Sequence, residues 1–307
     1  MNTDQRYLIS VVGATAVGKT AAAIQLANHY HTEIISADSR QLFCEMSIGT
    51  AKPTTDELRQ AHHHFINTHK VTNPFSVGDF EKQGIAALEQ IFTKHKIAIM
   101  AGGSGLYINA IVNGFDDLPI AQPEVREELN QLLATKGIDL LQQRLLSVDP
   151  IYYRQVDLNN PQRLIRALEV YQSTGKPYSS YRTGSLVKRD FSVIKIGLDL
   201  PREELYNRIN QRVDIMIADG LVDEVKSLTQ YRNLNALNTV GYTEIFDYLD
   251  GKTDLPAAIA LIKQNTRRFA KRQLTWFRRD KDIQWFKSTD VPIILEYIDA
   301  IVARLNA

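Results

Sequence analysis

The stretch Gly13-Ala14-Thr15-Ala16-Val17-Gly18-Lys19-Thr20 has the pattern G-x-x-x-x-G-K-[ST] and decides the fold. It follows an apolar run, residues 8–12, and opens an alanine-rich segment, residues 21–27, so the order strand, loop, helix is predicted. Glycines let a backbone wrap closely around oxyanions, and the N–H groups of the loop and of the helix N-terminus attract negative charge. Lys19 adds a positive charge, and Thr20 offers a hydroxyl to Mg²⁺. We expect these eight residues to bind a di- or triphosphate.

Size and composition indicate an ordinary globular protein. A chain of 307 residues can form one large domain or two modest ones, and 44% hydrophobic with 23% charged residues is typical of soluble proteins. Its single cysteine, Cys44, excludes an internal disulfide and fits a reducing compartment. We see no apolar run long enough to cross a bilayer and no secretory segment, so we expect a cytoplasmic protein without a membrane partner.

Positive charge is concentrated near the end of the sequence. The whole chain carries only +1, but residues 267–281 hold seven cations against one acid. Aromatic residues accompany them, and a predicted helix places Arg267, Lys271 and Arg278 along one side. A run of charge is usually a solvated surface, but this excess beside aromatic rings favours contacts with nucleic-acid phosphates.

A polar cluster follows the second predicted strand, residues 33–37. It consists of Asp38, Ser39, Arg40 and Gln41. The carboxyl ends of strands in a doubly wound sheet line the ligand crevice, so Asp38 is expected near the phosphate loop. The alternative is that Asp38 only caps a helix or a turn, but the cluster has more hydrogen-bonding capacity than a turn needs.

The third strand, residues 97–100, ends in glycine rather than in an acid. Nucleotide hydrolases with this loop commonly place a carboxylate there to hold Mg²⁺, whereas this chain has Gly102 and Gly103, followed by Ser104. We interpret the glycines as positions where a ligand closely approaches the backbone. Asp38 is then the best-placed carboxylate.

Between Pro119 and Asp190 the pattern changes to short helices, and residues 193–198 resume the strand pattern. One helix is predicted to begin at Asn160-Pro161 and to end at Gly175. The predicted fold is α/β: a P-loop NTPase-like, doubly wound, mostly parallel sheet with an inserted helical domain and a basic C-terminal helical region. We expect the core to comprise residues 1–118 and 191–307, and the insertion to comprise residues 119–190.

Two further groups of residues are candidates for binding an anion or a metal ion. Arg208 and Arg212 lie four apart on a predicted helix after Pro201, so both can reach one anion, and Arg212 is the preferred phosphate clamp. The three histidines at positions 62–64 suggest a metal, but neighbouring residues do not share a helix face and no cysteine or carboxylate lies at zinc-ligand spacing. We therefore expect no catalytic metal at these histidines.

Over essentially its whole length the chain resembles the bacterial tRNA dimethylallyltransferases, also called tRNA isopentenyltransferases. The phosphate loop is shared by many families, but its combination with the other stretches is specific. Two small departures are Ala14, where the family usually has Pro, and Ser104, where it often has Thr. The stretches that carry the resemblance are residues 13–20, 36–41, 48–53, 102–107, 160–169, 240–244 and 264–273.

The resemblance implies transfer of a dimethylallyl group from dimethylallyl diphosphate to N6 of the adenosine 3′ of the anticodon in tRNA. It implies catalytic roles for Asp38 as the base, one strand over from the loop, and for Lys19, Thr20 and Arg212 at the diphosphate, with Mg²⁺ on Thr20. The expected tRNA contacts are Asp38, Ser39, Arg40, Gln41, Ser104, Arg126, Gln162, Arg163, Leu164, Ile165, Arg166, Arg267, Lys271 and Arg278.

Two other functions fit parts of the sequence. A P-loop small-molecule kinase would use the same loop and arginines, although the basic helix would be superfluous. A nucleotide-gated RNA-binding module would keep the loop and the basic helix but could dispense with Asp38. The loop recognises phosphates more than bases, so weak ATP binding is expected in any case. No exposed apolar pattern calls for a partner copy, and we expect a monomer.

Overall fold

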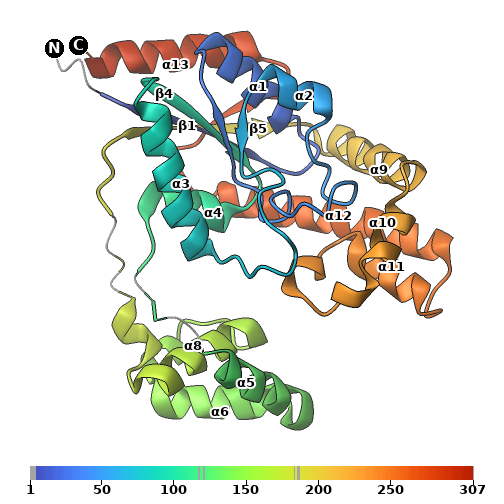
Figure 1. Ribbon diagram of the computed structural model, residues 1–307. Coiled ribbons are helices and arrows are strands. Elements are labelled where there is room, and N and C mark those ends of the chain that lie inside the picture. Colours follow the sequence, from blue (N-terminus) through green and yellow to red (C-terminus); the bar gives the residue numbers. More distant parts are fainter. Residues whose placement is uncertain (1–4, 117, 120–121, 183, 185–186, 307) are drawn as a thin grey trace. The chain divides into compact units, whose positions relative to one another are not determined.

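The computed structural model describes residues 5–116, 118–119, 122–182, 184 and 187–306. It divides into two compact units, which we call the core unit (Met1–Val112 with Arg189–Ala307) and the helical unit (Asn113–Lys188) (Figure 1). These bounds lie a few residues from those expected from the sequence. None of the described helices is long and apolar enough to cross a membrane.

A parallel sheet organises the core unit. Within the described residues it has six strands in the order β3-β2-β4-β1-β5-β6, and every neighbouring pair is parallel. Each parallel connection passes over a face of the sheet, which explains why helices alternate with strands along the chain. The predicted α/β, doubly wound architecture is confirmed.

The strands and helices of the core unit follow each other along the chain with short connections. Their bounds are β1 (Tyr7–Gly13), α1 (Lys19–His29), β2 (Ile34–Ser36), α2 (Thr55–Gln60), β3 (His63–His64), α3 (Val77–Phe92), β4 (Ile97–Gly102), α4 (Gly105–Asn113), β5 (Ser192–Asp199), α9 (Arg202–Ala218), α10 (Leu221–Ser227), α11 (Tyr242–Leu249), α12 (Leu255–Phe277), β6 (Gln284–Lys287) and α13 (Val291–Asn306).

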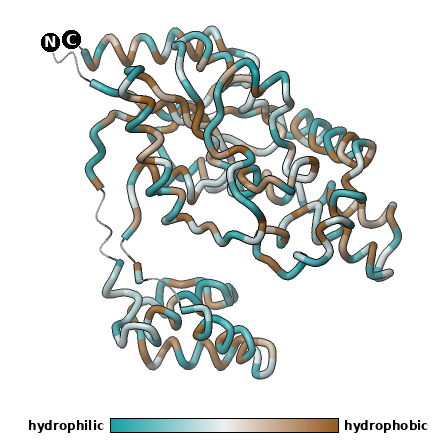
Figure 2. The backbone as a smooth tube through the Cα atoms, in the orientation of Figure 1, coloured by the Kyte–Doolittle hydropathy of each residue, from teal (hydrophilic) through white to brown (hydrophobic). Residues whose placement is uncertain are grey.

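Two hydrophobic cores cover the two faces of the sheet. Side chains of β1 alternate between them: Leu8 and Val12 pack with α3, α4 and α11, whereas Ile9 and Val11 pack with α1, α9 and α13. Figure 2 shows the corresponding apolar stretches along the strands. Because central strands are buried on both faces, they read as continuous apolar runs in the sequence.

Two elements at the end of the chain were not predicted. The strand β6 pairs with β5 at the edge of the sheet, and α13 then packs against α1 through Ile294 and Ile298. Both outer residues of β6, Gln284 and Lys287, are exposed, so this strand lacks the continuous apolar pattern of a central strand.

The helical unit has its own core. Its described elements are α5 (Pro123–Lys136), α6 (Ile138–Val148), α7 (Pro150–Tyr153), α8 (Pro161–Thr174) and a short 3₁₀ turn (Tyr178–Tyr181). Asn160 caps α8 by accepting a hydrogen bond from the N–H of Arg163, and Gly175 ends it with φ +71°. Leu129, Leu141 and Leu168 are buried together at the centre of the unit.

Candidate active site

The phosphate loop lies between β1 and α1 at the carboxyl edge of the sheet. Gly13 adopts φ +152°, and a Cβ there would lie 2.6 Å from the carbonyl oxygen of Leu198 on β5. Gly18 caps α1 in a left-handed conformation, φ +109°. Both positions require glycine, because a side chain would strain the backbone or collide with β5. The loop therefore has the shape that exposes its N–H groups and the start of α1.

Two buried cations converge on this loop, and neither forms an ion pair with a described residue. Burial lowers the pKa of Lys19 to about 8, partly offset by Asp38 and reinforced by Arg212. Burial also lowers the pKa of Arg212, with Glu57 opposing the shift. The Lys19 ammonium donates to the carbonyl of Ala14 at 2.7 Å, and Arg212 makes no hydrogen bond or ion pair with any residue described. Buried cations without an ion pair fit an anionic ligand.

The loop and the cations line a cavity of about 370 Å³. Thr20 and Asp38 line it too, so the predicted phosphate-binding and carboxylate residues meet at one site. The hydroxyl of Thr20 is a hard oxygen donor of the kind that Mg²⁺ prefers, and it fits a diphosphate-bound ion. Further lining residues are Thr50, Lys52, Glu57, His63, Gly102, Gly103, Phe269 and Gln273.

Asp38 holds the turn after β2 and also lines the cavity. Its Oδ1 accepts hydrogen bonds from the N–H groups of Arg40 at 2.9 Å and Gln41 at 3.3 Å, which holds the turn after β2. Its Oδ2 has no hydrogen bond within the described chain. The strand order corrects its expected position: β4 lies between β2 and β1, so Asp38 is two strands from the loop, not one.

The glycines that end β4 have a different purpose from the one predicted. A Cβ on Gly102 would lie 2.1 Å from the carbonyl oxygen of Ala37, and one on Gly103 would lie 2.2 Å from Nε2 of Gln273. Protein groups, rather than a ligand, therefore occupy the space that a side chain would need. Both glycines also line the cavity.

Gln273 on α12 is a site residue that the sequence reasoning missed. Its Oε1 accepts from the N–H of Thr15 at 2.8 Å, and its Nε2 donates to the carbonyl of Gly103 at 3.0 Å. The side chain thus joins the phosphate loop to the end of β4. Phe269, four residues earlier, faces the same cavity. The four-residue spacing predicts that Phe269 and Gln273 share one helix face. It does not predict that Gln273 contacts the phosphate loop.

The other residues after β2 are tied to their surroundings. Ser104 accepts from the N–H of Ser39 at 3.0 Å, and Arg40 donates to the carbonyl of Asn235 at 3.1 Å. Gln41 donates to the carbonyls of Thr50 and Ala51 at 3.2 and 3.1 Å. Gln41, Thr50 and Ala51 line the cavity, and these hydrogen bonds hold the segment that follows Asp38 in place.

The predicted RNA-contacting residues of the helical unit fall into two groups. Gln162 and Arg163 are exposed at the start of α8. The side chains of Leu164 and Ile165 are 0% and 1% exposed and belong to the core of the unit. They differ from those of Gln162 and Arg163 because successive helix residues point in different directions.

Arg126 and Arg166 share one buried partner. Both form ion pairs with Glu169, whose side chain is fully buried, while the guanidinium groups remain partly exposed. Arg166 also donates to the carbonyl of Pro119 at 3.0 Å. These arginines have an internal electrostatic partner that the sequence did not reveal.

Two of the predicted basic residues at and just after α12 have partners within the protein as well. Arg267 donates to Oδ1 of the uncharged Asn210 at 2.6 Å, and Arg278, directly after the helix, pairs with Asp199 at 2.7 Å. Lys271 is exposed. An exposed ion pair such as that of Arg278 is worth little and exchanges readily for another anion.

The sheet order and the loop define a P-loop α/β protein with a site for a phosphorylated substrate. The chain belongs to the IPP transferase family, whose model matches residues 41–280. It is 55% identical to the tRNA dimethylallyltransferase of Christiangramia forsetii, over 96% of this chain and 98% of that one. The enzyme of the same name from Cytophaga hutchinsonii is 47% identical, with 98% and 99% covered.

Solved structures agree with this assignment. The tRNA isopentenylpyrophosphate transferase of Bacillus halodurans superimposes with a TM-score of 0.71 at 36% identity, covering 96% of each chain. A eukaryotic dimethylallyltransferase acting on tRNA gives a TM-score of 0.79 at 27% identity, over 94% of this chain and 75% of that one.

Proposed function

We propose that this enzyme transfers a dimethylallyl group from dimethylallyl diphosphate to N6 of the adenosine 3′ of the anticodon in tRNA, releasing diphosphate. Membership of the IPP transferase family supports the reaction class. The observation that carries the site is the cavity itself: Lys19 and Arg212 bring positive charge to it, and Asp38 brings a carboxylate. A diphosphate and a nucleophile that must lose a proton need these two kinds of group.

The electrostatic half of the site serves the leaving group. As the bond between the allylic carbon and oxygen breaks, the electron pair goes to the diphosphate, and Lys19, Arg212 and the loop N–H groups stabilise the added charge. Thr20 would hold Mg²⁺, which supplies further positive charge to the diphosphate when bound. Gln273 positions the loop from behind through Thr15.

The carboxylate half serves the nucleophile. The exocyclic amine of adenine is weakly nucleophilic because its lone pair is delocalised into the ring. Asp38 takes one N6 proton as the new carbon–nitrogen bond forms, so the product is neutral at N6. The hydrogen bonds from Arg40 and Gln41 to Oδ1 orient the carboxylate and leave Oδ2 for the proton.

The target base must leave the anticodon stack to reach this cavity. Ser39, Arg40, Gln41 and Ser104 would contact the base as it enters. The tRNA would be bound by shape and phosphate through Gln162, Arg163, Arg126 and Arg166 of the helical unit, Arg267 and Lys271 on α12, and Arg278 directly after α12. The proposal includes a monomeric enzyme that works in the cytoplasm.

The reaction is tested by mass spectrometry of nucleosides from unmodified total tRNA incubated with the protein, Mg²⁺ and dimethylallyl diphosphate. ATP alone replaces the prenyl donor in the control. One dimethylallyl group gained on adenosine only with the prenyl donor supports the proposal. Folded protein that gives no gain, or that transfers the γ-phosphate of ATP to a small acceptor, refutes it in favour of a kinase.

A further inference from the structure

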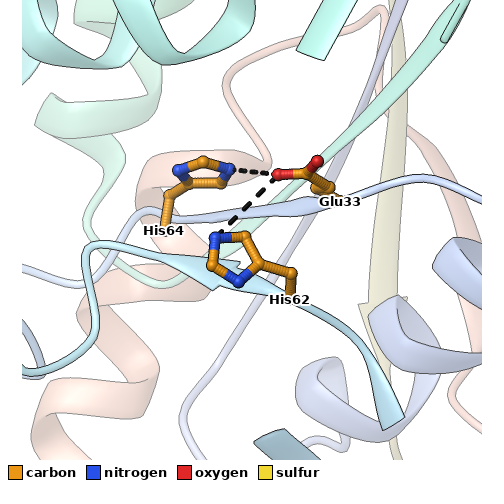
Figure 3. Close-up of side chains that lie close together, drawn as sticks. All are labelled: Glu33, His62 and His64. Carbon is orange, nitrogen blue, oxygen red and sulfur yellow. Dashed lines mark hydrogen bonds and ion pairs between the residues drawn. The ribbon is translucent and has the colours of Figure 1, made fainter. Parts of the chain in front are cut away.

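We propose that Glu33, His62 and His64 form a binding site for a divalent transition-metal ion, best suited to Zn²⁺, separate from the active site. The strand register puts the three side chains together. Ile34 pairs with His63 and Ile35 with His64, so Glu33 lies opposite His62, and all three residues point to the same face of the sheet (Figure 3).

The structure overturns the argument made from the sequence against a metal here. Neighbouring residues on a helix diverge, but the chain here is extended: His62 directly precedes the strand β3, and residues two apart in an extended chain share a face. The carboxylate comes from the residue directly before β2, at a sequence separation of 31 from His64, rather than from zinc-ligand spacing along the chain. His63, between the two ligands, faces the other way and lines the active-site cavity.

The distances are close to those that a metal ion needs. Nε2 of His64 lies 2.7 Å and Nε2 of His62 lies 3.9 Å from Oε2 of Glu33, and all three ligand atoms lie within 4.8 Å of one another. Ligands at about 2.0–2.1 Å from tetrahedral Zn²⁺ are about 3.3–3.5 Å apart. The His64–Glu33 hydrogen bond would therefore open slightly and His62 would move inward, both by small side-chain rotations.

The chemistry of the three groups also fits. Two imidazoles and one carboxylate are a common donor set for Zn²⁺, and such three-ligand sites keep a fourth position for water. A metal ion binds an unprotonated Nε2. In a neutral His64 the proton then sits on Nδ1, and a doubly protonated His64 releases its Nε2 proton on binding. Glu33 and His64 are 24% and 21% exposed, whereas His62 is 67% exposed, so the open position faces solvent. The nearby charge of Lys94 opposes the ion and limits its affinity.

A bound ion would fasten the edge strand of the sheet. The strand β3 has only two residues and pairs with β2 alone. An ion that joins Glu33 to His62 and His64 links the two strands through side chains, and ligand binding to the folded state raises its stability. Because His63 lies between the ligands, the ion would also fix that side chain at the cavity wall.

The test is a calorimetric titration of Zn²⁺ into chelator-treated, full-length protein. The solution contains excess Mg²⁺ so that the active site is occupied. Co²⁺ replaces Zn²⁺ in a parallel experiment read by its visible spectrum. We expect one equivalent bound at this site, and H62A to lower that affinity at least tenfold without a change in fold, because His62 is mostly exposed. E33Q and H64A should do the same, and H29A, which removes an exposed histidine of α1, should match the wild type.

Three results would overturn the site. They are no uptake of either ion by the wild-type protein, unchanged affinity and Co²⁺ spectrum in H62A, or an equal loss in H29A. Enzyme activity does not enter this test, so its outcome is independent of the proposed prenyl transfer.

Discussion

Lys19 and Arg212 in the core unit and Arg126 and Arg166 in the helical unit are all partly enclosed cations, but their surroundings differ. Glu169 is buried to neutralise the second pair, whereas the first pair faces a cavity and has no ion pair with any residue that the structure describes. Removing one partner of a buried ion pair destabilises a fold, whereas buried cations without an ion pair favour an anionic ligand. We therefore expect Lys19 and Arg212 to act on the diphosphate, and Arg126 and Arg166 to be needed for the fold of the helical unit as well as for the proposed tRNA contact.

Among the four cations, the largest effect is expected from removing one that has no ion pair with a described residue. Lys19→Ala should lower kcat/KM for prenyl transfer by about 10²–10³-fold, because one stabilising group at the developing charge is lost. Steady-state kinetics with dimethylallyl diphosphate measures this. The control is Lys82→Ala, which removes an exposed lysine of α3 and should keep wild-type kinetics. Equal kcat/KM for the two variants would contradict the proposed role of Lys19 at the diphosphate.

In the helical unit the corresponding change should act on stability. Arg126→Ala leaves the buried Glu169 carboxylate with Arg166 alone, at 3.4 Å, which should destabilise the unit by about 3 kcal/mol. Hydrogen exchange over residues 122–182 should then accelerate. Arg163→Ala, which removes an exposed arginine of α8, should leave exchange unchanged. If Arg126→Ala weakens tRNA binding with unchanged exchange, Arg126 serves the substrate instead.

The lowered pKa of Lys19 predicts how binding depends on pH. In the free protein Lys19 is charged below about pH 8 and neutral above it. The terminal phosphate of the donor ionises near pH 6, so it is fully charged throughout this range. Affinity for dimethylallyl diphosphate should therefore fall by several-fold as pH rises through 8, with proton uptake on binding. Calorimetry in buffers of different ionisation enthalpy measures that uptake, and a flat profile from pH 7 to pH 9.5 would contradict the assigned role of Lys19.

A smaller effect is expected for the residue that supports the loop. Gln273→Leu removes the hydrogen bonds to Thr15 and Gly103 and should lower kcat/KM about tenfold, through a looser loop rather than a lost charge. Gln264→Leu, at an exposed position of the same helix, is the matched control. A loss as large as that of Lys19→Ala would mean that Gln273 contacts the substrate directly.

Local patterns in the sequence predicted much of this molecule. The phosphate loop, the strand before Asp38 and the helix from Asn160 to Gly175 each depend on neighbouring residues, and the structure has all three. The sheet order is not local, so Asp38 was expected one strand too close to the loop. The hydrogen bond between Thr15 and Gln273 spans 258 positions, and no pattern along the chain announces it.

An error arose where the wrong periodicity was applied. The histidines at positions 62–64 were judged as helix residues, although His63 and His64 form β3 and His62 directly precedes it. The burial of the Leu164 and Ile165 side chains was not foreseen either, because these residues share a motif with polar ones. The periodicity of an element predicts which side chains of a motif share a face. Which face is exposed follows only once the fold is known.

The central claim is that Asp38 accepts the N6 proton in the cavity opposite Lys19 and Arg212. The most direct test is the single-turnover rate of tRNA prenylation by Asp38→Asn, with the affinities for tRNA and dimethylallyl diphosphate measured separately. Asparagine keeps the acceptor for Arg40 and Gln41, so the turn is retained. We predict a rate lower by about 10²–10⁴-fold with both affinities within about twofold of wild type. A near wild-type rate with unchanged binding would show that another group takes the proton.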